Sequence, residues 1–286
     1  MLSMAKHTSG KLNWLEEHLP EGLVVDAAWL SKHGYSTSLR SQYVSAGWLE
    51  QPARGVYHRR LRGALTWQQI VISLQTILAH PIEVGGRTAL ELQGYAHYLP
   101  HDAKEVHLYG SKPPPNWLHK LRVGVRFVYH NDQKLFRNQP ITRGLSHLNW
   151  DVAKGQGEST DAIHGGLTLQ RWGQWNWPLT LSKPERALFE LLDELPNRES
   201  FDQVDKLIGG LTNLSPRRLQ KLLADCRSVK VKRLFFFFAD RHQHAWLKRL
   251  DKSVIDLGQG NRMLVKGGRL DRTYKITIPE ALDGVP

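Results

Sequence analysis

Apolar residues recur at helical spacing near the start of the chain. Leu12, Leu15 and Leu19 are three and four residues apart, and Pro20 follows them directly. A proline cannot continue a helix, so this pattern predicts a short amphipathic helix that ends at residue 19. The apolar run 23–25 after it predicts a short β-strand.

Two more helices and a hairpin are predicted before residue 60. Asp26 as N-cap and Gly34 as stop predict a helix over 27–33. Ser36 or Ser38 as N-cap and Gly47 as stop predict a second helix that reaches Ala46. The β-type runs 48–51 and 55–58, joined by a turn at 52–54, predict the hairpin. The order helix, strand, helix, turn, helix, hairpin is that of a winged helix-turn-helix.

The pattern changes after the basic linker 59–63. The pattern up to residue 180 predicts helices over 66–78 and 88–99, strands at 106–109 and 123–129, a loop-rich stretch over 131–160, and two strands within 165–180. After residue 180 it predicts helices that open at Ser182, Ser200 and Ser215, a helix rather than a buried strand over 231–238, and a closing strand over 273–278. We therefore predict an α+β protein with a winged helix-turn-helix over 1–62 and a larger mixed α+β domain over 63–286, divisible into 63–180 and 181–286.

Charge and cysteine content narrow the function class. Thirty-nine Lys and Arg residues against 27 Asp and Glu give a net charge of +12, which favours a polyanionic partner such as nucleic acid. The single cysteine, Cys226, excludes an intrachain disulfide and any multi-cysteine zinc site, and its leucine-rich surroundings predict a buried thiol. No apolar run approaches the length of a membrane span, and residues 1–11 lack the apolar core of a secretory signal. These features predict a cytoplasmic protein with no membrane partner.

The third predicted helix is the candidate DNA reader. Leu39, Tyr43 and Ala46 lie at spacing that directs them to a small core. The residues left outward, with the wing and its exit, form the predicted DNA-binding set: Thr37, Ser38, Arg40, Ser41, Gln42, Ser45, Arg54, His58, Arg59 and Arg60. Within it, Arg40 is suited to guanine or phosphate and Gln42 to adenine. The alternative is a small helical bundle used for protein contacts, but the absence of acidic residues between positions 32 and 49 favours DNA.

A second basic cluster lies near the C-terminus. Its residues are Arg217, Arg218, Lys221, Arg227, Lys230, Lys232 and Arg233. Runs of charge are usually solvated faces of a helix, so the alternatives are a plain surface or a second surface for nucleic acid or a toxin.

The sequence offers no catalytic motif. The histidines lack the spacing of a zinc site, and no Gly-x-Ser-x-Gly elbow is present. Residues 85–88, Gly-Gly-Arg-Thr, are similar to a phosphate-binding loop but lack its Gly-Lys-Ser/Thr ending, which favours a structural turn. We predict no catalytic residue, no metal and no cofactor.

The chain resembles a known family along nearly its whole length. The first group of matching segments, 21–26, 47–50 and 55–57, resembles the N-terminal domain of AbiEi-type antitoxins of abortive-infection systems. The second group resembles later parts of the same family's sequence and comprises 84–92 with Gly94, 106–109, 182–188 and 228–234. Each segment is modest alone, and their order makes the combination specific.

The resemblance implies an antitoxin that represses its own operon by binding inverted repeats in promoter DNA. It also implies a functional partner, a toxin of the nucleotidyltransferase type, that is counteracted without a stable complex. Two alternatives stay open: a nucleic-acid-processing enzyme that a winged helix directs to its substrate, and a transcription factor that senses a small ligand.

Overall fold

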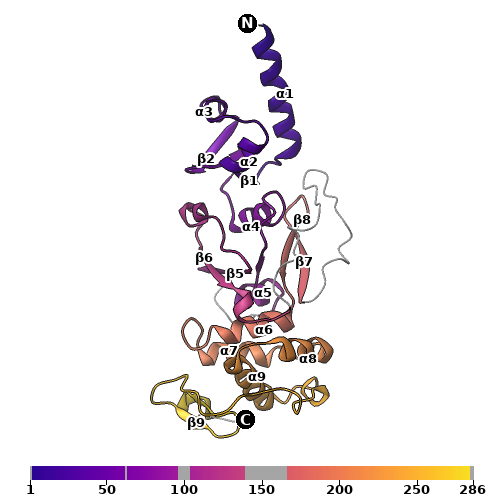
Figure 1. Cartoon of the computed structure of the whole chain (residues 1–286), viewed down its shortest axis with the longest axis vertical. Coiled ribbons are helices and arrows are strands. Elements are labelled where there is room, and N and C mark those ends of the chain that lie inside the picture. The colour runs from indigo at the N-terminus through magenta and orange to yellow at the C-terminus, as the bar shows by residue number, and fades with distance from the viewer. Residues whose placement is uncertain (1, 62, 96–103, 139–165, 284–286) are drawn as a thin grey trace.

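The computed structural model describes residues 2–61, 63–95, 104–138 and 166–283. The molecule is elongated: α1 lies at one end of its long axis and β9 at the other (Figure 1). Three parts follow one another along that axis, namely an N-terminal unit, a mixed sheet and a helical layer.

The N-terminal unit has the predicted order of elements. It comprises α1 (Leu2–His18), β1 (Val24–Asp26), α2 (Ala27–Lys32), α3 (Thr37–Ser45), β2 (Leu49–Ala53) and β3 (Val56–Arg59). The strands form an antiparallel sheet in the order β1-β3-β2. The predicted caps are confirmed, because Asp26 accepts a hydrogen bond from the amide of Trp29 and Ser36 one from the amide of Leu39. Gly47 ends α3 in the left-handed region, at φ +74°.

A five-stranded sheet forms the middle of the molecule. Its strands are β4 (Ile82–Val84), β5 (Glu105–Gly110), β6 (Arg126–Asn131), β7 (Leu167–Trp172) and β8 (Trp177–Ser182). Their order is β6-β5-β4-β8-β7, with parallel pairing of β5 with β6 and of β4 with β8. Helices α4 (Trp67–Gln75) and α5 (Gly86–Leu92) contact this sheet.

The last part is mostly helical. It contains α6 (Pro184–Asp193), α7 (Phe201–Gly209), α8 (Pro216–Asp225) and α9 (Val229–His242), followed by the short strands β9 (Arg269–Asp271) and β10 (Ile276–Ile278). Helix α9 confirms the helical reading of the phenylalanine run and packs against α6 and α7. Cys226 is buried as predicted, and burial raises the pKa of its thiol to about 12.

Several predicted boundaries need correction. Helix α5 begins two residues before the predicted start and ends at Leu92, while residues 96–99 of that prediction lie outside the described residues. Helix α6 has Lys183 as its N-cap, because the hydroxyl of Ser182 donates to Glu190 instead of capping the helix. Ala46, predicted to face the core, is exposed. Most of the stretch 131–160 lies outside the described residues.

The N-terminal unit and the rest of the chain share one apolar core. Leu15 and Val24 belong to the same cluster of buried side chains as Ile72, Leu181 and Phe235. Strand β1 packs against α4, and the amide of Val24 donates to the hydroxyl of Ser73 at 2.8 Å. The predicted boundary at residues 62 and 63 therefore crosses a packed contact, and it stays a prediction.

Candidate nucleic-acid interface

Helix α3 presents a row of short polar side chains to solvent. Thr37, Ser38, Ser41, Gln42 and Ser45 are all exposed, as predicted from their spacing. No Asp or Glu lies in α3, so the exposed row carries no charge that would repel phosphate. Short side chains allow a helix to approach the floor of the major groove closely, where a carboxamide can address adenine.

The prediction that Arg40 lies on this outer face is wrong. Arg40 is only 7% exposed, and its guanidinium points into the N-terminal unit. The Nη1 atom donates to the carbonyl oxygen of Ala27 at 2.9 Å and to Ser31 Oγ at 2.7 Å, and Nη2 donates to Thr37 Oγ1 at 2.9 Å. A further bond reaches the carbonyl oxygen of Tyr35. Arg40 therefore ties α3 to α2 and to the turn between them.

The wing contributes two exposed cations. The turn between β2 and β3 carries Arg54, which is exposed, and Gly55 permits the turn with φ +80°. Arg60, directly after β3, is exposed as well. These positions suit contacts with the DNA backbone beside the groove.

His58 and Arg59 differ from their predicted roles. His58 is 4% exposed, and its Nδ1 lies 2.7 Å from the carbonyl oxygen of Arg59, so it cannot reach DNA without rearrangement. The Nη1 atom of Arg59 donates to the carbonyl oxygens of Glu16 and Leu19 at the end of α1. A cation there offsets the negative end of the helix dipole, so Arg59 holds α1 on the wing instead of reaching outward.

Sequence reasoning missed an exposed tryptophan beside the reading helix. Trp48 follows Gly47 at the end of α3 and is 48% exposed. With Leu12 and Arg60 it borders a hollow of about 360 Å³ between α1 and the wing. The β-type run 48–51 predicts a strand here, but β2 begins at Leu49 and Trp48 lies in the bend before it, where strand alternation gives no indication of burial.

The second basic cluster is only partly a surface. Lys232 and Arg233 are buried, and both donate to backbone carbonyl oxygens of the segment 256–260, so their prediction as surface residues is wrong. Lys230 is half-buried and bonds the carbonyl oxygens of Asp193 and Leu195. The remaining members, all exposed, are Arg217, Arg218, Lys221 and Arg227. Of these, Arg218 forms an ion pair with Glu185 at 3.2 Å.

The turn at residues 85–88 is structural. The amide of Gly86, which a phosphate would need, donates to the Oε2 atom of Glu190 at 2.9 Å. A Cβ atom at Gly85 would lie 2.4 Å from that oxygen and from the ring of Tyr109, so glycine is required by close packing. Burial is the largest influence on Glu190 and raises the pKa of its carboxyl group.

Two neighbouring histidines, the buried His107 and the half-buried His130, lie at the edge of the sheet. His107 Nδ1 is 3.1 Å from His130 Nε2, and His130 Nδ1 is 3.0 Å from Glu194 Oε1. The three ligand-type atoms lie within 4.8 Å of one another, yet His130 uses its two opposite nitrogens for the two partners. The three groups thus form a hydrogen-bonded series in which His130 lies between His107 and Glu194. Burial and the neighbouring His130 lower the pKa of His107 to about 4, so it is neutral at pH 7.

Arg40 generates a prediction about stability. Replacing Arg40 with alanine leaves the carbonyl oxygens of Ala27 and Tyr35 and the hydroxyl of Ser31 without their donor, so we expect a loss of about 2–4 kcal/mol in the free energy of unfolding. Arg40→Lys should recover only part of it, because one ammonium cannot reproduce the planar fork. Urea denaturation measures both values, with exposed Arg54→Ala as the control, and equal stabilities of Arg40→Ala and the control would contradict this role.

No helix among the described residues is long and apolar enough to cross a membrane.

Comparison with known proteins places the chain. The family profile described as "Transcriptional regulator, AbiEi antitoxin N-terminal domain" matches residues 8–101. The profile described as "Transcriptional regulator, AbiEi antitoxin, Type IV TA system" matches residues 103–279. No curated protein sequence matches the chain.

A solved structure has a similar fold. The crystal structure of the RV2827C protein from Mycobacterium tuberculosis superposes with a TM-score of 0.52 at 15% sequence identity, covering 95% of this chain and 89% of that one. At this identity the likeness concerns the fold alone. The two profiles together cover almost the whole chain, and the protein therefore belongs to the AbiEi antitoxin family of transcriptional regulators.

Proposed function

We propose that the protein represses its own operon by binding inverted repeats in promoter DNA through α3 and the wing. The observation that carries the proposal is the exposed, acid-free polar row of α3 beside the exposed Arg54. In this arrangement α3 enters the major groove, while Arg54 and Arg60 contact phosphates on either side. The net charge of +12 supports the approach to DNA in general but gives no sequence preference.

The corrected positions change which side chains read the bases. Arg40 is engaged inside the unit, so the longest polar side chain on the exposed row is that of Gln42. A glutamine can bond adenine through two atoms, which makes Gln42 the proposed base-specific contact. The serines then permit close approach, and Thr37 additionally accepts a bond from Arg40 that fixes the start of α3.

We propose further that the larger domain counteracts a toxin of the nucleotidyltransferase type without forming a stable complex with it. Family membership supports the antitoxin role. The class of the toxin, and the assignment of DNA binding to residues 1–62 and of antitoxicity to residues 63–286, are parts of this proposal. The exposed Arg217 and Lys221 on α8 are candidates for this second role.

Base reading by Gln42 can be tested on the DNA immediately upstream of the gene. Gln42→Ala should weaken binding to this fragment by about 1–3 kcal/mol and leave binding to a shuffled fragment unchanged, because only the base-specific contact is lost. Fluorescence anisotropy at fixed salt measures both affinities. Gln259→Ala, at an exposed glutamine far from α3 in the chain, is the matched control. Equal affinities of Gln42→Ala and the wild type for the upstream fragment would remove Gln42 from the interface.

The two wing cations generate a prediction about salt dependence. Replacing Arg54 and Arg60 together with alanine should weaken binding to the upstream and shuffled fragments alike. The slope of log K against log salt should become shallower by about 0.9 for each lost phosphate contact. Arg217→Ala, on α8, should leave the slope unchanged. If only the α8 variant alters the slope, the contacting surface is the second cluster and not the wing.

Repression and protection should be separable within the full-length protein. The triple variant with alanine at Gln42, Arg54 and Arg60 changes only exposed side chains, so it should fold normally and lose operator binding. We expect it still to rescue growth of cells that express a nucleotidyltransferase-type toxin from an independent promoter. Immunoblots establish equal protein levels. Loss of rescue at normal levels would show that protection depends on the DNA-binding face.

A further inference from the structure

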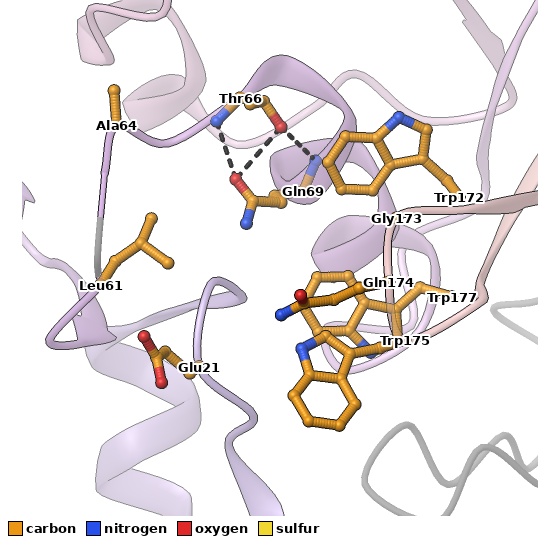
Figure 2. Close-up of a pocket in the computed structure, with 10 residues that line it drawn as sticks. All are labelled: Glu21, Leu61, Ala64, Thr66, Gln69, Trp172, Gly173, Gln174, Trp175 and Trp177. Atoms are coloured by element: carbon orange, nitrogen blue, oxygen red, sulfur yellow. Dashed lines mark hydrogen bonds between the residues drawn. The ribbon is translucent and has the colours of Figure 1, made fainter.

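A cavity of about 690 Å³ lies where the N-terminal unit meets the sheet. One side is formed by three tryptophans of the hairpin between β7 and β8, Trp172, Trp175 and Trp177, and the opposite side carries Glu21 and Leu61 (Figure 2). Its volume is in the range of small-molecule sites. No residue of the predicted DNA-binding set lines it.

The hairpin is built to present these indoles. Trp172 and Trp177 are directly paired across the strands, and Gly173 and Asn176 make the turn with positive φ angles of 71° and 52°. Trp177 is 4% exposed and anchors the hairpin, whereas Trp175 at the turn is 62% exposed. An indole left in water at the rim of a cavity has an unsatisfied apolar face that a flat ligand can cover.

A buried amide faces the same space. The residue Gln69 is 8% exposed, and its Oε1 atom accepts from the amide of Thr66 at 2.9 Å and from the Thr66 hydroxyl at 3.1 Å. Its Nε2 atom points toward the cavity (Figure 2) and donates to no group among the described residues. A Cβ atom at Gly22 would lie 2.4 Å from this Nε2 atom, so glycine keeps room beside the amide. The cavity thus holds an oriented hydrogen-bond donor for which the described residues show no acceptor.

The chemistry of the walls selects the ligand class. Flat indole faces stack on aromatic rings, and the side-chain amides of Gln69 and Gln174 offer a donor and an acceptor for a ring edge. We propose that the cavity binds one unstacked nucleobase, with its ring against Trp175 and Trp172 and its edge toward Gln69.

This site is distinct from the DNA-reading face of α3. It takes a single exposed base, either of a free nucleoside or of a single strand, and not a duplex. The proposal therefore stands independently of operator binding, and its test contains no operator DNA.

The test uses the full-length protein and 2-aminopurine riboside, whose fluorescence is quenched when its base stacks on an indole. We expect saturable quenching by the wild type and by Trp48→Ala, which removes an equally large exposed indole outside the cavity. Trp175→Ala should weaken the affinity at least about fivefold, in keeping with the measured contribution of one base–aromatic stack. Gln174→Ala, a second exposed-rim variant, should weaken it less.

A second arm identifies the source of the base. A short single-stranded oligonucleotide with one 2-aminopurine is titrated against the same variants. If it binds tenfold or more tightly than the riboside and Trp175→Ala weakens it, the ligand is a strand; if the two probes bind alike, it is a free nucleoside. Absence of saturable quenching with both probes, or equal affinities of Trp175→Ala and Trp48→Ala, would overturn the proposal. Circular dichroism establishes that each variant is folded.

Discussion

The arrangement of sheet and helical layer depends on the pairing of one buried cation. Arg186 is 2% exposed and lies between two carboxylates, with Asp132 at 3.1 Å and Glu190 at 2.8 Å. A guanidinium removed from water is tolerated only where hydrogen-bond acceptors take up its donors, and carboxylates also balance its charge. Glu190 also accepts from the amide of Gly86 and the hydroxyl of Ser182. One charge network therefore fixes the end of β6, the start of α5, the end of β8 and helix α6 in a single geometry.

The need of a buried guanidinium for hydrogen-bond acceptors also explains why the prediction for α3 fails at Arg40. Periodicity treats an arginine as polar and places it outward, yet Arg40 lies between Leu39 and Tyr43 on the inward side of α3. An arginine can be buried when backbone carbonyl oxygens take up its donors, and the carbonyl oxygens of Ala27 and Tyr35 do so here. The hydrogen bonds of Arg40 join α2, the turn and the start of α3, and so position the exposed row of α3 relative to α2; this supports the base contact proposed for Gln42.

Local signals were sufficient for most elements because caps and stops act within a few residues. Asp26, Ser200 and Ser215 cap helices as predicted, and Gly47 takes the left-handed conformation. Sheet order was beyond such reasoning. Strand β4 pairs in parallel with β8, almost a hundred residues later, and no local pattern encodes that partner. The tryptophan cavity was missed for the same reason, since Glu21 and the hairpin meet only through tertiary packing.

The contact of β1 with α4 determines how operator binding and ligand binding in the tryptophan cavity can influence each other. Because β1 packs on α4 and Val24 bonds Ser73, the N-terminal unit cannot tilt without disturbing the shared core. The cavity lies at this junction, with Glu21 on the side of the N-terminal unit and Trp177 on the side of the sheet. A ligand there changes operator affinity only if it contacts the two sides differently in the free and DNA-bound arrangements. The shared core makes large rearrangements costly, so any such coupling has to act through the contacts of β1 with α4, including the bond between Val24 and Ser73.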